Sequence, residues 1–313
     1  MIVLPRSNDT DLRQILYDVQ EGKIQLPEFQ RDWTWDDNRI RGIIASLSQG
    51  YPMGAVMQLQ YGNPDIKFKY RTITGVENKN ATPEYLVLDG QQRLTSIYQS
   101  TYSNQVVATK TDKGKSIKRF YYLDMNKCLD DNEDRLDAVI IVPQDRKIKT
   151  NFDRDIIMDL STREFEYQLK MFPINIIYDN TQLMQWNFGY MMYYKEDVNA
   201  NDLLNRFQKE VVETILQYKL PVITLDKSTP REAVCKVFET LNRYSEEYKT
   251  HQMKKSSKGF LPPVTDTATQ VGKLYARTVL NAYYADKITA RDTSGYLLNL
   301  KAKNFGKLER WCF

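Results

Sequence analysis

The chain has 313 residues, of which 42% are hydrophobic and 27% charged, so it can form one large domain with an appendage or two modest domains. Its 44 basic and 40 acidic residues give a net charge of only +4, which excludes DNA coating by overall charge and confines any nucleic-acid surface to a local patch. The single histidine, His251, excludes within this sequence a histidine-based zinc site, a Ser-His or Cys-His triad and an HNH-type nuclease centre.

Cysteine usage and hydropathy indicate the compartment. Cys128, Cys235 and Cys312 are far apart and odd in number, and no pair has metal-ligand spacing. The first residues, MIVLPRSNDTDLRQ, lack an apolar core long enough for a signal peptide, and no run of about 18 apolar residues predicts a membrane span. We therefore expect a cytoplasmic protein with no membrane segment.

The first sixty residues predict alternating helices and strands. An apolar stripe that follows candidate caps at residues 8–10 and stops at Gly22 predicts a helix over residues 10–21. An extended segment over 23–27, a helix capped by Asp36 or Asp37 and closed by Gly50, and an alternating strand over 54–60 follow.

The loop over residues 28–35, EFQRDWTW, carries side chains that can bind a ligand. Tryptophans can stack on a base, and a guanidinium such as that of Arg31 can hold phosphate. The alternative is a loop whose aromatic residues close the end of a core while Arg31 pairs with Asp32 or Asp36. The polar residues 61–83 then predict a surface excursion with a hairpin around Asn63-Pro64.

The central segment of the sequence is EYLVLDGQQRLTSIYQS, residues 84–100. It predicts a buried strand, a tight turn and an amphipathic helix, with Asp89, Gln91, Gln92 and Arg93 around the first N–H groups of that helix. Such a helix start attracts phosphate, Gly90 permits close approach, and Asp89 can hold Mg²⁺ against phosphate. The alternative is an ordinary turn whose arginine pairs with a nearby carboxylate.

The remaining residues predict further strands and a long helical part. Strands are expected over 103–109, 119–124, 138–142 and 220–225, and the basic turn over 110–118 is a solvated hairpin tip or a nucleic-acid contact. Residues 153–217 predict helices whose aromatic residues form core: Phe165, Tyr167, Phe172, Trp186, Phe188, Tyr190, Tyr193 and Tyr194. A helix from Pro230 ends near Asn242, a linker covers 254–263, and helices are expected over 268–285 and 289–300.

Three segments together resemble one known family. IQLPEFQRDWTW at 24–35, LVLDGQQRLTSIY at 86–98 and VFETLN at 237–242 are similar, in this order, to domain of unknown function 262, the S half of GmrSD-type, modification-dependent restriction systems. The resemblance covers residues 1–253 and implies an α+β, ParB/sulfiredoxin-like mixed sheet, here with a large helical part over 153–253. It implies an anti-phage protein that binds and hydrolyses a nucleoside triphosphate with Mg²⁺ and senses DNA, including modified DNA.

The resemblance also implies roles for individual residues. Asp89 and Arg93 would be catalytic, with Asp89 as the metal ligand. The nucleotide would be bound by Gln30, Arg31, Gly90, Gln91, Gln92 and Asn242. After Asn242 the chain departs from the small-residue turn that is usual in the family and continues as RYSEE.

The HNH nuclease half of such systems has no counterpart in this sequence, so cutting would belong to a nuclease partner or to a lost domain. The tail over 265–313 resembles the C-terminal helices of ImmA/IrrE-type regulators without their HExxH zinc helix, and predicts a small helix-turn-helix or a docking or dimerisation module. Two other functions stay open: a DNA-binding regulator or adaptor without nucleotide turnover, and a nuclease in which Asp226 or Glu239 joins Asp89.

Overall fold

The chain forms two compact units, Met1–Phe238 and Glu239–Phe313. The computed structural model describes residues 5–64, 66–77, 80–103, 105–111, 113–151, 154–237, 239–240, 273–285, 289–297 and 300–312. The domain boundaries predicted from the sequence, 253 and 265, lie outside these residues, as do the linker and Asn242.

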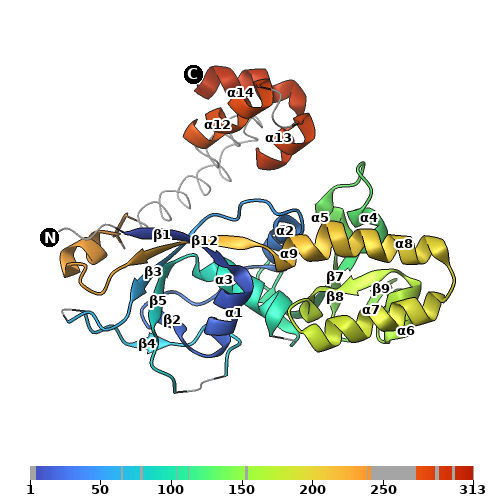
Figure 1. Cartoon of the computed structure of the whole chain (residues 1–313), viewed down its shortest axis with the longest axis horizontal. Helices are drawn as coiled ribbons and strands as arrows, with labels where there is room; N and C mark the ends of the chain where they lie inside the picture. The colour runs from blue at the N-terminus through green and yellow to red at the C-terminus, as the bar shows by residue number, and fades with distance from the viewer. Residues whose placement is uncertain are drawn as a thin grey trace. The chain divides into compact units, whose positions relative to one another are not determined.

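The first unit contains helices and strands in alternation, and its mixed sheet confirms the α+β class (Figure 1). Its strands are β1 (Arg6–Asp11), β2 (Ile24–Pro27), β3 (Val56–Gln60), β4 (Tyr70–Arg71), β5 (Tyr85–Asp89), β6 (Val107–Lys110), β7 (Ser116–Asp124), β8 (Val139–Pro143), β9 (Lys147–Thr150), β10 (Asp155–Asp159), β11 (Met171–Pro173) and β12 (Lys219–Leu225). Its helices are α1 (Leu12–Gln20), α2 (Asp37–Ser48), α3 (Gln91–Ile97), η1 (Tyr98–Tyr102), α4 (Met125–Cys128), α5 (Arg135–Ala138), α6 (Arg163–Gln168), η2 (Ile174–Ile176), α7 (Asn180–Tyr194), α8 (Val198–Phe207), η3 (Gln208–Val212) and α9 (Glu213–Leu216).

The main sheet has six strands in the order β1-β12-β3-β5-β2-β4. β12 is parallel to β3 and β2 is parallel to β5, whereas β3 and β5 run antiparallel, so the sheet is mixed. β5 lies between β3 and β2, and Leu86, Val87 and Leu88 are buried there, as the apolar run predicts. The more specific ParB/sulfiredoxin-like topology stays a prediction.

The helices and strands predicted before residue 60 are confirmed with one correction. Residues 6–11 form the edge strand β1, paired antiparallel with β12, and the helix begins only at Leu12. Its cap is Asp11, whose carboxylate accepts the N–H of Arg13 at 2.8 Å, and not residues 8–10. The pairing with a strand more than 200 residues later gives the sequence no local signal.

The segment over 61–83 is more than a surface excursion. Ile66, Ile73 and Val76 are buried, and β4 pairs with β2. The hairpin predicted around Asn63-Pro64 does not occur among the described residues; the side chain of Asn63 instead donates to the carbonyl oxygen of Thr229 at 2.8 Å.

The second part of the unit combines strands with the helices after residue 160 (Figure 1). β6, β8 and β11 each pair with β7, and β9 and β10 form a separate hairpin. β10 and β11 contradict the expectation of a wholly helical segment over 153–217. The aromatic residues divide: Tyr167, Phe172, Trp186 and Tyr190 are buried as predicted, whereas Phe165, Phe188 and Tyr193 are exposed.

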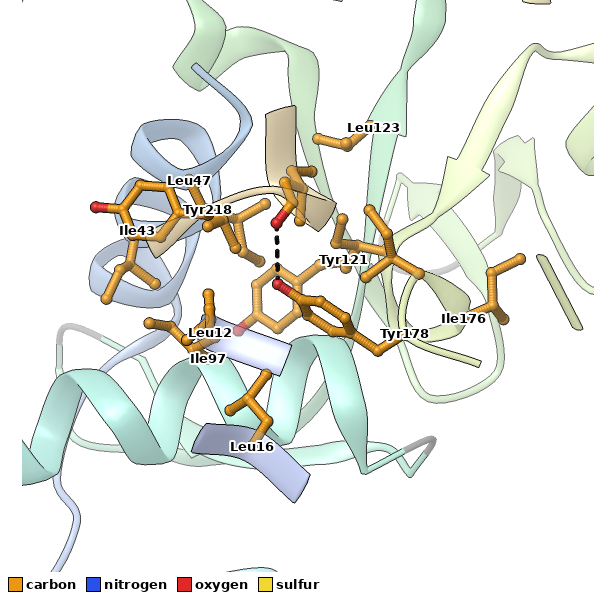
Figure 2. Close-up of a cluster of buried hydrophobic side chains, with 14 of the residues drawn as sticks. Leu12, Leu16, Ile43, Leu47, Ile97, Tyr121, Leu123, Ile176, Tyr178 and Tyr218 are labelled. Atoms are coloured by element: carbon orange, nitrogen blue, oxygen red, sulfur yellow. Dashed lines mark hydrogen bonds between the residues drawn. The ribbon is translucent and has the colours of Figure 1, made fainter. Parts of the chain in front are cut away.

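One hydrophobic core joins the two parts of this unit. Figure 2 shows side chains from α1, α2, α3 and β7 converging with Tyr178 and Tyr218, and the Tyr178 hydroxyl donates to the carbonyl oxygen of Ile215 at 3.2 Å. Because α1, α2 and α3 each bury an apolar face here, the turn that leads into α3 is held on a rigid base.

The second unit is helical in its described residues. α12 (Lys273–Tyr284), α13 (Ala290–Tyr296), η4 (Ala302–Asn304) and α14 (Phe305–Cys312) surround a core that includes Leu280, Leu297 and Leu308. The predicted helix over 289–300 ends at Tyr296, and α14 was not predicted. In the described parts of the whole chain, every helix is too short or too polar to span a bilayer.

Candidate functional site

The turn between β5 and α3 has the shape that the sequence predicts. Gly90 has φ +92°, a left-handed conformation that glycine adopts without strain, and the N–H of Leu94 closes the first helical bond to its carbonyl oxygen at 2.9 Å. A Cβ at residue 90 would lie 2.9 Å from Cγ2 of Val56, so a larger residue has no space. The turn therefore fixes Asp89 at the end of β5 and Arg93 in the first turn of α3.

Asp89 and Arg93 form an ion pair, with 3.3 Å between Asp89 Oδ2 and Arg93 Nη2. The guanidinium also donates to the carbonyl oxygens of Met53 and, at 2.9 Å, of Ala55. Arg93 thus holds the loop over residues 51–55 against α3, which is a structural use of a group that the sequence assigns to phosphate. The Arg93 side chain keeps 24% of its surface exposed and Asp89 keeps 49%, so both are accessible to a ligand.

The same 51–55 loop is held from a second direction by Tyr218. Its hydroxyl donates to the carbonyl oxygen of Tyr51 at 3.0 Å and accepts the N–H of Met53 at 3.1 Å. Burial raises the pKa of Tyr218, while the Met53 N–H and the nearby Arg93 charge oppose that rise. The phenol therefore stays neutral and keeps both hydrogen bonds at physiological pH.

Gln91 and Gln92 bind protein backbone. Both are buried, and they hold the loop over residues 28–36, which we call the aromatic loop. Gln91 Nε2 donates to the carbonyl oxygen of Arg31 at 2.8 Å. Gln92 Nε2 donates to that of Asp32 at 3.0 Å, while its Oε1 accepts the N–H of Thr34 at 2.9 Å. These bonds bring together two motifs that lie about 60 residues apart in the sequence.

Gln30 and Arg31 lie at the start of the aromatic loop with different surroundings. Gln30 Nε2 donates to the carbonyl oxygens of Val87 at 2.6 Å and Leu88 at 3.0 Å, so its amide is used to join the loop to β5. The Arg31 side chain is exposed and makes no hydrogen bond or ion pair within the described residues. The alternative pairing of Arg31 with Asp32 or Asp36 is not formed: Asp32 lies 3.3 Å from Arg71, and Asp36 lies 3.4 Å from Arg39.

The sequence did not indicate three supports of this site: Gly54, Arg71 and Tyr218. Gly54 has φ +79°, and a Cβ there would overlap Nη1 of Arg93, so glycine admits the guanidinium to the loop. Arg71 donates to the carbonyl oxygens of Gln30 and Arg31 at 3.1 and 3.2 Å. Of these three residues, only Gly54 had a local feature that could have been recognised, a glycine before a strand. Arg71 and Tyr218 contact residues that lie far from them in the sequence.

The donor set at Asp89 fits a magnesium ion that is shared with a ligand. Mg²⁺ is commonly held by one or two carboxylates together with substrate phosphates, and Asp89 is a half-exposed carboxylate with one oxygen outside the ion pair. The described residues contain no group of three or more His, Cys, Asp or Glu side chains that could hold a metal by themselves. A site of this kind would therefore need the phosphates of a nucleotide to complete the coordination.

The sequence resembles known proteins over most of its length. Residues 12–257 match the family model described as GmrSD restriction endonuclease, N-terminal domain. The chain is also 30% identical over 250 residues to the uncharacterized protein MJ0686 of Methanocaldococcus jannaschii, an alignment that includes 76% of this chain and 39% of that protein. The matched range contains the aromatic loop, α3 and the 51–55 loop, and the chain spans well under half of the relative's length.

Proposed function

The chain belongs to the family of the GmrSD restriction endonuclease N-terminal domain, and from this premise we propose that it binds and hydrolyses a nucleoside triphosphate and senses DNA for a separate nuclease. The family gives the chain a role in a restriction system. The nucleotide, the DNA and the nuclease partner are parts of the proposal.

The observation that carries the proposal is the joining of the two motifs. Hydrogen bonds from Gln91 to the Arg31 carbonyl oxygen and from Gln92 to that of Asp32 hold the aromatic loop beside the start of α3, the helix that follows the accessible Asp89. Among the described residues the exposed Arg31 guanidinium has no protein partner, and Asp89 is a half-exposed carboxylate. A guanidinium and a carboxylate are groups that bind a triphosphate with Mg²⁺.

In this arrangement each residue has a distinct task. Arg31 binds phosphate oxygens, and Asp89 holds Mg²⁺, which neutralises phosphate charge when bound. Arg93 orients Asp89 through their ion pair, and it holds the 51–55 loop. Gln30, Gln91 and Gln92 act as positioning residues, because their amides bind backbone groups of the protein itself.

One observation favours the second candidate, an adaptor that does not turn a nucleotide over. Gln91, Gln92 and much of the Arg93 guanidinium are satisfied within the protein, so the motif can serve the fold alone. In that case the turn is a structural joint, and DNA or partner binding is the whole function.

Phosphate release from the four common nucleoside triphosphates with Mg²⁺, with and without DNA, separates the two candidates. We expect turnover that DNA alters and that both Arg31→Ala and Asp89→Asn reduce at least tenfold, while Arg206→Ala, an exposed arginine on α8, does not. Arg31→Ala is preferred to Arg93→Ala because Arg31 holds no described backbone group through its side chain. A folded chain that neither binds nor hydrolyses any of the four nucleotides would refute the nucleotide part and favour the adaptor.

A further inference from the structure

A groove of about 1300 Å³ lies on the side of the aromatic loop that faces β6 and β7. Trp33, Thr34 and Trp35 of the loop line it together with residues of β6, β7, β8 and β9. None of the described residues predicted for the nucleotide site lines this groove, so the groove is a distinct cavity that shares the aromatic loop with that site.

The two tryptophans are held in place by the fold. Trp33 Nε1 donates to Ser96 Oγ at 3.0 Å, and the carbonyl oxygen of Trp35 accepts the Thr109 hydroxyl at 2.6 Å. A bridge between Asp36 and Lys110 joins the end of the loop to β6. Both indoles pack partly against the core and remain partly exposed, so they form a rigid, accessible wall.

The lining carries an excess of positive charge. Five cationic side chains and only two carboxylates, Asp37 and Asp145, line it. Asp37 lies 3.8 Å from Arg119, and Asp145 lies 2.5 Å from Lys149. Lys110 and Lys118 are exposed and have no carboxylate partner within the described residues, so their charges are available to a ligand.

We propose that this groove binds single-stranded DNA, with phosphates on Lys110 and Lys118 and bases against Trp33 and Trp35. A cationic groove with aromatic side chains on its wall is the arrangement that holds single strands, since unstacked bases expose their faces to indoles. In a duplex the base faces are covered by their neighbours, and only the phosphates would reach the lysines. The inference rests on the DNA-sensing part of the proposed function and gives it a location.

The test measures binding of a fluorescein-labelled single-stranded oligonucleotide to the full chain by fluorescence anisotropy over a range of salt. The variant is Lys110→Ala/Lys118→Ala, and its charge-matched control is Lys209→Ala/Lys227→Ala, two exposed lysines that do not line the groove. We expect the groove variant to bind roughly tenfold more weakly and its log K against log salt slope to be shallower by about 1.4, the loss of two phosphate contacts to a single strand. The control variant should have the same affinity and the same salt slope as the unmodified chain.

Tryptophan fluorescence supplies the second measurement. A base stacked on an indole should quench emission, and Trp33→Phe/Trp35→Phe should remove the quenching that the unmodified chain shows. Trp186 and Trp311 are present in both proteins, so quenching that only the unmodified chain shows is assigned to Trp33 and Trp35. Melting curves of each variant establish that it is folded.

Each other result overturns the inference in a distinguishable way. If the chain binds the oligonucleotide and the groove variant equals the control, the DNA site lies elsewhere and the proposed function stands. If only duplex binds, with a slope change near 1.8 and no quenching, the groove is a duplex site. If neither form of DNA binds while nucleotide turnover persists, both the groove assignment and the DNA-sensing role are wrong.

Discussion

Gln92 Oε1 accepts a hydrogen bond from the N–H of Thr34 at 2.9 Å, and this bond lies at the centre of the candidate site. The residue before Thr34 is Trp33, on the groove wall, and two residues before that is Arg31, beside the start of α3. One loop therefore belongs to both the proposed nucleotide site and the groove. Any movement of it that a nucleotide induces would change DNA affinity, and DNA would change nucleotide affinity by the same factor.

The first prediction concerns that bond. Gln92→Glu replaces the amide donor to the Asp32 carbonyl oxygen with a second acceptor, so two oxygens would face each other in a buried place. We expect a loss of about 1–3 kcal/mol in the free energy of unfolding. Urea titration measures it, with the exposed Gln185→Glu as control. Equal midpoints for the two variants would mean that the loop is not held by Gln92.

The second prediction concerns Arg93. Arg93→Ala leaves the carbonyl oxygens of Met53 and Ala55 without their charged donor, so we expect the free energy of unfolding to fall by about 2 kcal/mol. Arg93→Lys should recover part of the loss, since an ammonium can reach one carbonyl but lacks the fork. Urea titration would contradict this role if Arg93→Ala were as stable as the surface variant Arg206→Ala.

The third prediction uses a pair of glycines. Gly54→Ala and Gly62→Ala both place alanine at positive φ, +79° and +93°, but only the Cβ at residue 54 would overlap Arg93. We expect Gly54→Ala to be more destabilising by at least about 1 kcal/mol. In an Arg93→Ala background the difference should shrink, because the overlapping group is gone. A difference that survives in that background would assign the cost to something other than Arg93.

The fourth prediction concerns alkaline pH. Burial raises the pKa of the Tyr98 phenol to about 12, with smaller contributions from Tyr102 and Glu77. Because the unfolded chain ionises this group near pH 10 and the folded chain does not, its contribution to stability is complete below pH 10 and is lost as the pH rises to about 12.

Melting temperatures between pH 9 and 12 should show that loss. Tyr98→Phe should make the fall of the unfolding free energy with pH shallower by up to about 1.4 kcal/mol per pH unit. The substitution also removes the hydrogen bond to Gln20, so it lowers stability at neutral pH. The exposed Tyr17→Phe should leave the slope unchanged. Identical slopes for Tyr98→Phe and the unmodified chain would show that Tyr98 does not titrate in this way.

The sequence by itself determined the elements whose signals are local. The stripe of α1, a cap at Asp36 or Asp37, and the strand, Gly90 turn and helix around residue 90 follow from periodicity and from residues only a few positions apart. The two motifs that we propose to bind ligands could also be recognised, because their unusual residue types stand together in short segments.

Only the tertiary structure decided how those motifs are used. Whether Gln91 binds a ligand or the Arg31 carbonyl, and whether Arg93 holds phosphate or the 51–55 loop, depends on which backbone groups the fold brings within 3 Å. The groove likewise depends on a hydrogen bond from the Thr109 hydroxyl to the Trp35 carbonyl oxygen, between residues 74 positions apart in the sequence. Hydrogen bonds act over a few ångströms in space and not along the chain, so no local pattern could distinguish a side chain that binds a ligand from one that holds the site together.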